Sequence, residues 1–237
     1  MSKYEVIFKK IDNLIEQERQ DMANLYLAYF DGSSEAQIFS DLKDKTEVLM
    51  LEFDGRLVGF TTLQVFEYSW LGKSIRVIYS GDTIVDKAHW GQQALAFAWI
   101  NRMGELKREY LELPMYWFVI VKGHRTYKYL PTFGKSFYPH WSIDRSDLKP
   151  LADALAKEKF GANYNPKTGI VEFPESKGHL KMEIALPTDE EKNKESVQFF
   201  LKKNPKYLIG HELVCLCEIE VENMKPLTKR IFSKGIL

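Results

Sequence analysis

The chain has 237 residues, and its 33 lysines and arginines balance 33 aspartates and glutamates. This length is sufficient for a buried core, and the charge balance excludes an overall positive field that would draw the protein to nucleic acid or to an anionic membrane. Apolar runs are short and the first ten residues lack a signal-peptide core, so we expect a cytoplasmic globular protein without a membrane span.

The first third of the chain has the apolar spacing of helices. Positions 11–29 predict one long helix, and Ser33 or Ser34 is placed to cap a second helix over positions 36–42. The sequence therefore predicts two helices before any strand.

A hairpin and a third strand follow. Asp54 and Gly55 separate the runs 48–53 and 57–66, and this pair is a strong turn signal because both positions accept positive φ. Residues 75–85 predict the next strand.

The central part of the chain alternates between strand and helix patterns. A helix is expected from 96 to 110, a buried strand over 115–121 and a shorter helical segment over 124–134. A strand, a helix and a strand in this order predict a parallel pair with a right-handed crossover.

The junction between the strand 75–85 and the helix after it is the most informative part of the sequence. A strand that ends in a glycine-containing turn and is followed at once by a helix leaves backbone N–H groups pointing the same way, which suits phosphate. The run Val85-Asp86-Lys87-Ala88-His89-Trp90-Gly91-Gln92-Gln93-Ala94-Leu95 resembles the GNAT-type N-acyltransferase superfamily at this place. Gly91 matches a family glycine, whereas Trp90 stands in a basic or glutamine position and Gln93 replaces the second glycine.

The resemblance implies a mixed fold of helices and strands, α/β in the broad sense and α+β in the narrower one. We expect a GNAT-like mixed central sheet that is flanked by helices and has a V-shaped splay between its fourth and fifth strands. Residues 1–144 would form the acyltransferase core, and residues 145–237 would complete the sheet or form a small second lobe.

The C-terminal part is read from its own pattern. Helices are expected over 147–160 and 190–203, the second capped by Thr188 or Asp189. Strands are expected over the segments 167–173, 179–186 and 212–221.

The resemblance also implies a co-substrate, acetyl-CoA or another acyl-CoA. Family members hold its pyrophosphate on the turn and its pantetheine arm against the preceding strand. The residues at the matching positions are Thr83, Ile84, Val85, His89, Trp90, Gly91, Gln92, Gln93 and Ala94.

Acyl transfer to an amine needs a base for the ammonium and an acid for the leaving thiolate. Asp82 is the candidate base, on a largely apolar strand in which Gly81 indicates a bulge; the alternative is a carboxylate bonded to neighbouring backbone. In the family a tyrosine protonates the thiolate, and Tyr129 precedes Phe133-Gly134 at about the matching spacing, with Tyr127 two residues away. Both tyrosines also suit simple packing.

The histidines and cysteines do not indicate a metal site. The five histidines lack ligand spacing. Cys215 and Cys217 fall on one face of a predicted strand and are expected to be reduced core thiols.

Three functions remain open. The favoured one is an acyltransferase that moves an acyl group from acyl-CoA, or from acyl carrier protein, to an amine of a small metabolite or peptide. The second is a degenerate relative that binds a thioester without turnover. The third, an interaction module that uses the basic aromatic segment 122–138, is least favoured.

Overall fold

The computed structural model describes residues 3–174 and 177–236. The chain divides into two compact units. The first comprises Met1–Ala28, Ser34–Tyr116 and Ile219–Leu237, and the second comprises Tyr29–Ser33 and Trp117–Glu218.

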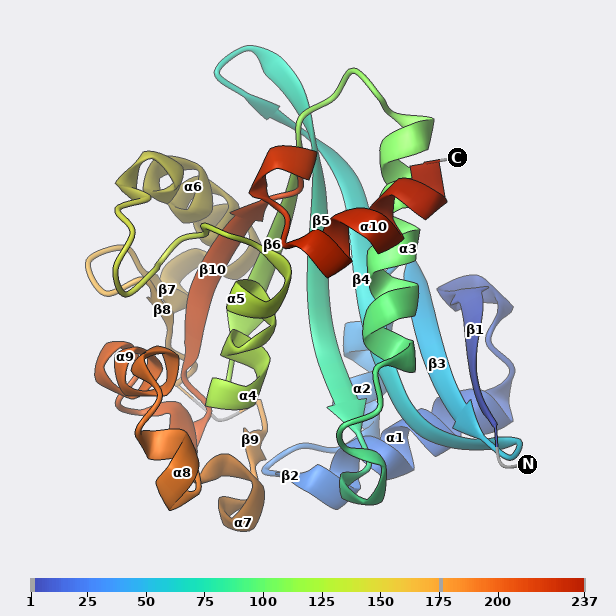
Figure 1. Ribbon diagram of the computed structural model, residues 1–237. Helices are drawn as coiled ribbons and strands as arrows, with labels where there is room; N and C mark the ends of the chain where they lie inside the picture. The colour runs from blue at the N-terminus through green and yellow to red at the C-terminus, as the bar shows by residue number, and fades with distance from the viewer. Residues whose placement is uncertain (1–2, 175–176, 237) are drawn as a thin grey trace. The chain divides into compact units, whose positions relative to one another are not determined.

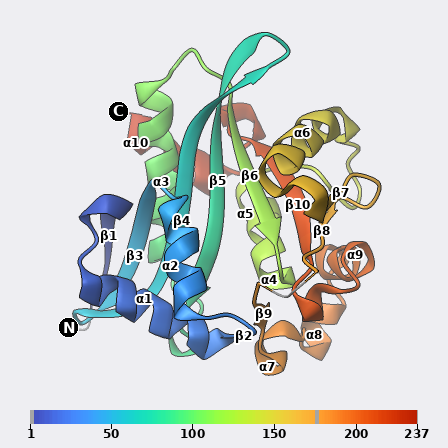
Figure 2. The same cartoon turned by 180° about the vertical axis from the view of Figure 1, so that it is seen from behind.

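The first unit is an antiparallel sheet with helices on both faces (Figures 1 and 2). Its strands follow the order β1, β3, β4 and β5, and each neighbouring pair is antiparallel. Helix α3 packs on one face and carries α10 on its outer side, whereas α1 and α2 lie on the opposite face. The elements are β1 Tyr4–Lys10, α1 Glu16–Tyr29, α2 Glu35–Lys43, β3 Glu47–Phe53, β4 Arg56–Trp70, β5 Lys73–Val85, α3 Ala94–Glu109 and α10 Pro226–Ile236.

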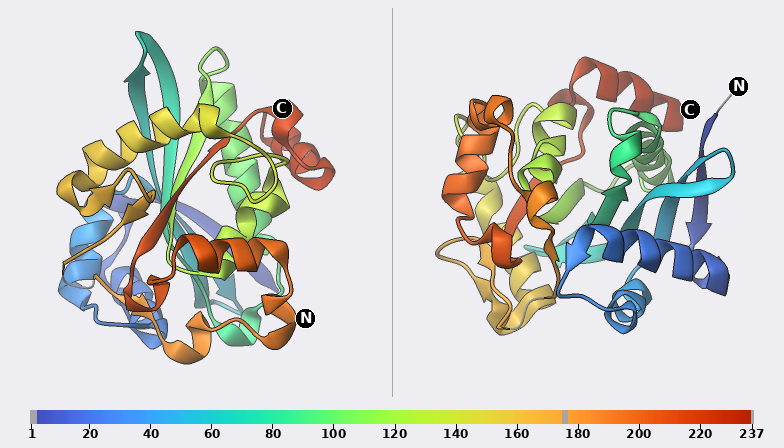
Figure 3. Two further views of the ribbon diagram at one scale, coloured as in Figure 1. Left: turned by 90° about the vertical axis from the view of Figure 1, so that its left-hand side faces the viewer. Right: turned by 90° about the horizontal axis from the view of Figure 1, so that it is seen from below.

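The second unit has strands in the order β6, β10, β8 and β7, and a separate pair formed by β2 and β9. Helix α6 packs on β10, and α4 packs against α9 (Figure 3). The strands are β2 Phe30–Asp31, β6 Met115–Val121, β7 Tyr164–Asn165, β8 Ile170–Val171, β9 His179–Leu180 and β10 Glu212–Glu218. The helices are α4 His124–Tyr127, α5 Tyr129–Phe133, α6 Lys149–Phe160, α7 Met182–Ala185, α8 Asp189–Lys192 and α9 Glu195–Lys203.

The predicted α/β class, a central sheet flanked by helices, is confirmed. The predicted splay and crossover concern β5 and β6, and most of β6 belongs to the second unit. Both features therefore stay predictions, as does the division into a core of residues 1–144 and an extension of residues 145–237. None of the helices over 3–174 and 177–236 is long and apolar enough to cross a membrane.

Two tight turns set the register of the first sheet. Asp54 and Gly55 have φ values of 50° and 75°, so the first hairpin is confirmed with both turn residues left-handed. Leu71 and Gly72 repeat this geometry at 51° and 77° between β4 and β5. The second turn was not predicted, because leucine is an unusual residue at positive φ.

The predicted start of the chain is wrong. Strand β1 precedes both helices and pairs with β3 along its whole length, so a strand comes first. Helix α1 begins only at Glu16, after a short 3-10 turn over Ile11–Asn13. The sequence did not indicate this strand, because every residue of β1 is at least partly exposed and the strand has no continuous buried run. The cap of α2 is confirmed, since Gln37 N donates to Ser34 Oγ at 3.3 Å.

The C-terminal elements are shorter than predicted. The expected strands over 167–173 and 179–186 shrink to the two-residue strands β8 and β9, and α7 occupies part of the second segment. The expected helix over 190–203 is divided into α8 and α9, with Thr188 as the confirmed cap of α8. The final strand ends at Glu218. Helix α10 was not predicted.

Candidate functional site

The candidate donor side of the site begins at a β-bulge in β5. On β4, Phe60 pairs with Ile84 and Thr62 pairs with Gly81, so two residues of β5 stand opposite one residue of β4. The predicted bulge is therefore confirmed. Its left-handed residue is Asp82, with φ 47°, rather than the neighbouring glycine.

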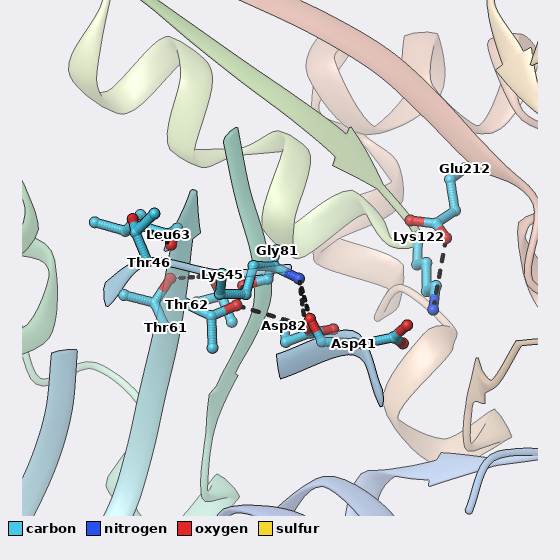
Figure 4. Close-up of polar contacts among 11 residues, drawn as sticks. Asp41, Lys45, Thr46, Thr61, Thr62, Leu63, Gly81, Asp82, Lys122 and Glu212 are labelled. Atoms are coloured by element: carbon cyan, nitrogen blue, oxygen red, sulfur yellow. Dashed lines mark hydrogen bonds and ion pairs between the residues drawn. The ribbon is translucent and has the colours of Figure 1, made fainter. Parts of the chain in front are cut away.

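Asp82 has a cationic partner that the sequence did not reveal (Figure 4). Lys45 Nζ lies 3.3 Å from Asp82 Oδ2, and the lysine side chain is only 6% exposed while that of Asp82 is 26% exposed. Lys45 also donates to Asp41 O at 3.5 Å and lies over the ring of Tyr79, 5.4 Å from its centroid. Any substrate ammonium that approached Asp82 would compete with Lys45.

Hydroxyl groups hold the bulge in place. Thr62 Oγ1 donates to Gly81 O at 2.9 Å and lies 3.5 Å from Asp82 Oδ2. The hydroxyls of Thr61 and Thr83 are 2.7 Å apart. The Thr83 side chain is therefore tied to β4, so its backbone is the part better suited to a ligand.

The end of β5 is covered by an indole. Trp90 Nε1 donates to Val85 O at 2.8 Å, although Trp90 as a whole remains 41% exposed. Ile84, one residue earlier, is buried. A ligand that bonded to the carbonyl of Val85 would share it or compete with Trp90.

The turn before α3 has free space around its glycine, and a side chain of the same turn caps the helix. Gly91 has φ 89°, and a Cβ added there would meet no atom within 4 Å. Helix geometry leaves the N–H groups of the first turn of α3, at Ala94–Ala96, without acceptors inside the helix. One of them, Leu95 N, donates to Gln92 Oε1 at 3.3 Å, whereas the Gln93 side chain caps nothing. Phosphate would compete with Gln92 for this position.

His89 lies in an aromatic cluster. Its Nδ1 is 2.9 Å from Tyr4 Oη, and its ring centroid is 4.9 Å from that of Phe53. The adjacent turn is held by Asp86, whose Oδ1 accepts from Ala88 N at 2.8 Å. The His89 side chain thus packs against the ends of β1 and β3, and its contact with a donor stays a prediction.

The two tyrosines lie in the second unit and differ in their surroundings. Tyr127 is fully buried and its hydroxyl donates to Pro139 O at 2.7 Å. Tyr129 is partly exposed, with its ring centroid 5.6 Å from that of Phe133. Burial raises the pKa of both hydroxyls, so both are protonated at neutral pH. Because Tyr127 is committed to Pro139, Tyr129 is the better candidate for an acid.

Two polar contacts in the structure were not predicted from the sequence. The first is made by Lys45, which follows α2 in an irregular segment and has no periodicity that would indicate burial. The second is the contact between the buried His124 and the partly exposed Glu191. These residues are 67 positions apart, so only the fold shows that they meet.

Among the residues that the structure describes, no three His, Cys, Asp or Glu side chains are grouped as a metal ion would require. The two cysteines are buried and unpaired with each other, as expected.

No protein-family model matches the chain. No curated protein is found to be similar to it either.

Solved structures provide the remaining comparison. A probable N-acyltransferase of Enterococcus faecalis is similar over 67% of this chain and 44% of its own, at 11% identity and a TM-score of 0.45. An acyl-CoA N-acyltransferase of Pseudomonas aeruginosa is similar over 49% of this chain and 79% of its own, at 20% identity and a TM-score of 0.38. The GNAT family N-acetyltransferase YhbS of Escherichia coli, solved in complex with CoA, is similar over 51% of this chain and 64% of its own, at 15% identity and a TM-score of 0.36.

The chain spans less than half the length of the first of these structures. All three are described as N-acyltransferases or N-acetyltransferases.

Proposed function

We propose that the chain is a GNAT-type acyltransferase. It moves an acyl group from acyl-CoA, or from acyl carrier protein, to an amine of a small metabolite or a peptide. The observation that supports this best is the bulged strand β5, which runs through the turn at Gly91 into the N-terminus of α3. A bulge followed by such a turn offers a strand for an amide-containing arm and N–H groups for a phosphate.

Two local rearrangements would let this region bind a pantetheine arm and a phosphate group. The Val85 carbonyl is taken by Trp90, and one N–H of α3 is taken by Gln92. The space beside Gly91 is open. Tyr129 is the proposed acid for the thiolate, and Asp82 is the base that the sequence predicts.

The two acyl donors differ in the phosphate groups that the turn before α3 would have to bind. Acyl-CoA carries a nucleotide diphosphate, which needs the N–H groups of the turn. A carrier protein presents phosphopantetheine without the nucleotide, so it would tolerate a turn whose N–H groups are partly used. The choice of donor is therefore open to a direct binding comparison.

A thermal shift experiment tests the donor. CoA, acetyl-CoA and palmitoyl-CoA should each raise the melting temperature with increasing concentration if they bind the folded protein. A lack of shift with all three, together with no binding of acylated carrier protein, would reject the proposal.

A matched pair of variants tests the place of the phosphate. Gly91→Val should weaken CoA binding at least tenfold, because a β-branched residue is strained at φ 89° and fills the open space. Gly91→Asn is the control for the backbone, since asparagine tolerates positive φ. If Gly91→Val binds CoA as well as the native chain does, the phosphate lies elsewhere.

A binding protein without turnover is the second candidate. The Lys45–Asp82 pair favours it, because that pair ties up the predicted base. Release of free thiol from acetyl-CoA in the presence of primary amines separates the two functions. A protein that binds acetyl-CoA but releases no thiol with any amine would support the second.

A further inference from the structure

Strand β1 forms the open edge of the sheet of the first unit. It stands at the end of the strand order and, among the strands that the structure describes, pairs with β3 alone (Figure 1). Proteins commonly protect such an edge with a proline or a β-bulge. The run Tyr4–Lys10 contains no proline, and its register with β3 has no shift. Neither device therefore blocks the pairing of another strand with β1.

Hydrogen bonds at the two ends of β1 show which backbone groups face outward. Ile11 N donates to Thr46 O at 3.1 Å, and Asp54 N donates to Lys3 O at 3.4 Å. Hydrogen-bonded residues alternate along an antiparallel strand, so the odd-numbered residues of β1 bond to β3 in this continuous register. The N–H and C=O groups of the even-numbered residues therefore point to the open edge; these residues are Tyr4, Val6, Phe8 and Lys10.

The side chains of β1 alternate between the two faces of the sheet. Phe8 lies on the α3 face, because the guanidinium carbon of Arg102 is 4.7 Å from the centroid of its ring. Lys9 lies on the α1 face, where its Nζ is 2.5 Å from Glu18 Oε1. The even-numbered residues thus share the α3 face, and the odd-numbered residues share the α1 face.

The backbone of β1 is complementary to that of a second copy. When two β1 strands run antiparallel with Ile7 opposite Ile7, even-numbered residues meet even-numbered residues. Val6 then lies opposite Phe8 of the second copy, and Tyr4 lies opposite Lys10. Each of these pairs can exchange both backbone hydrogen bonds, since its N–H and C=O groups all face the open edge. This register uses the strand along its whole length.

The charges of β1 favour the same register. Glu5 lies opposite Lys9 of the second copy, at a non-hydrogen-bonded position where side chains approach closely. Glu5 is exposed, and no ion pair within residues 3–174 and 177–236 includes it. Lys9 donates one bond to Glu18, and its ammonium has further donors. A shift of two residues would place Glu5 opposite Ile7 or Ile11, so the charge pair would be lost.

Pairing of two β1 strands would also cover exposed apolar side chains. Phe8 is 42% exposed, and Val6 of the second copy would lie against it. A β-branched and an aromatic residue stabilise each other across a strand pair. Ile15 is 61% exposed and lies close to Lys9, because its N–H donates to Glu18 Oε2 at 3.1 Å. Both faces of the edge therefore offer apolar surface to a second copy.

We infer that β1 is the interface through which two copies of the chain form a symmetric dimer. The two strands pair antiparallel about Ile7, and the sheets of the two first units become continuous. A two-fold axis at Ile7 uses the same surface on both copies, so the contact closes on itself and does not build a filament. The inference concerns the first unit alone and does not depend on the proposed function.

Sedimentation velocity of the native chain tests the association. Between about 1 and 300 µM, the sedimentation coefficient should rise from the monomer value to the dimer value and no further. A chain that stays monomeric over this range would overturn the inference and leave the edge of β1 to a strand of another protein. Species larger than a dimer would overturn it as well, because the proposed contact is closed.

Two charge reversals test the register. Glu5→Lys places two like charges opposite each other at each end of the strand pair. Lys9→Glu does the same with the opposite sign, and Glu18→Gln is added to it so that no repulsion arises within one chain. Each variant alone should dimerise at least about tenfold more weakly. An equal mixture should form a heterodimer with the native affinity, and a mixture that associates no better than either variant would overturn the inference.

Glu112→Lys is the matched control. Glu112 is exposed in the same unit and lies outside β1, so this variant makes the same change of charge away from the edge. Its dimerisation should stay within twofold of the native value. If it dissociates the dimer as Glu5→Lys does, net charge rather than the edge controls association and the inference is wrong. Far-UV circular dichroism shows whether each variant retains the native fold.

Hydrogen exchange locates the contact within the dimer. The amide protons of Val6 and Phe8 should exchange slowly in the native dimer and rapidly in the Glu5→Lys variant. The amide protons of Ile7 and Lys9 bond to β3 and should be protected in both. A native dimer in which Val6 and Phe8 exchange rapidly would be held together by another surface, and the inference would fall.

Discussion

Gly104 of α3 and Gly235 of α10 face each other where the two helices cross (Figure 1). A Cβ on Gly104 would lie 2.2 Å from Phe232 O and 3.0 Å from the Cα of Gly235. A Cβ on Gly235 would lie 2.2 Å from Asn101 O. The two backbones therefore touch directly, and glycine is required at both positions for room.

The first prediction concerns this crossing. Gly104→Ala should lower the free energy of unfolding by about 1–3 kcal/mol, because the new methyl group meets backbone that cannot rotate away. Urea unfolding measures the change. Arg108→Ala, on the exposed side of the same helix, is the control and should stay within about 0.5 kcal/mol of the native value. A Gly104→Ala variant as stable as this control would show that α10 is free to move off α3.

The second prediction separates the two tyrosines. Tyr127→Phe should lose about 1–3 kcal/mol of stability, because Pro139 O would remain buried without its donor. Tyr129→Phe should instead lower kcat by at least about 10² with little change in acetyl-CoA affinity. Urea unfolding and steady-state kinetics measure the two effects. The proposed acid role of Tyr129 is excluded if its phenylalanine variant turns over at the native rate.

The third prediction is a dependence of stability on pH. The pKa of His124 is lowered in the folded state, so the unfolded chain takes up the proton first as the pH falls. Its contribution to stability is complete above about pH 6.5 and declines below it, by up to about 1.4 kcal/mol per pH unit, until the lowered folded pKa is reached. Urea unfolding between pH 8 and pH 5 measures this decline. His124→Gln should flatten the plot of unfolding free energy against pH in that range. An identical slope in the native and variant chains would show that the pKa of His124 is not lowered by folding.

The fourth prediction concerns the bulge. Lys45→Met and Asp82→Asn, alone and together, form a double-mutant cycle, and asparagine retains the positive φ that the backbone requires at this position. The coupling energy should be about 1–2 kcal/mol, between that of a surface ion pair and that of a fully buried one, because Asp82 is partly exposed. Additive effects of the two substitutions would mean that the ion pair contributes nothing to stability.

The sequence predicted those parts of the fold whose signals are local. The turn at Asp54 and Gly55, the cap at Ser34 and the strand Met115–Val121 each depend on residues close together in the chain, and all three are present. Strand β1 was missed because its pairing with β3 is a long-range contact that the residues of β1 alone do not indicate. Helix α10 was missed in the same way, since its place against α3 depends on close contact with Gly104.

The candidate site shows the same division. The bulge near Gly81 could be predicted from the interrupted strand pattern, and it is confirmed. Lys45 approaches Asp82 from 37 residues away, and Glu191 approaches His124 from 67 residues away. Partners that are this far apart depend on tertiary structure, so no motif in the sequence reveals them.

Trp90 gives the proposed donor site an optical signal of its own. Its indole is exposed to solvent, yet it is anchored to the carbonyl of Val85 at the end of β5. A molecule that shares or takes over this carbonyl would alter the surroundings of the indole and change its fluorescence. With the other four tryptophans replaced by phenylalanine, emission from Trp90 alone would report the arrival of each donor in real time, without any label on the donor.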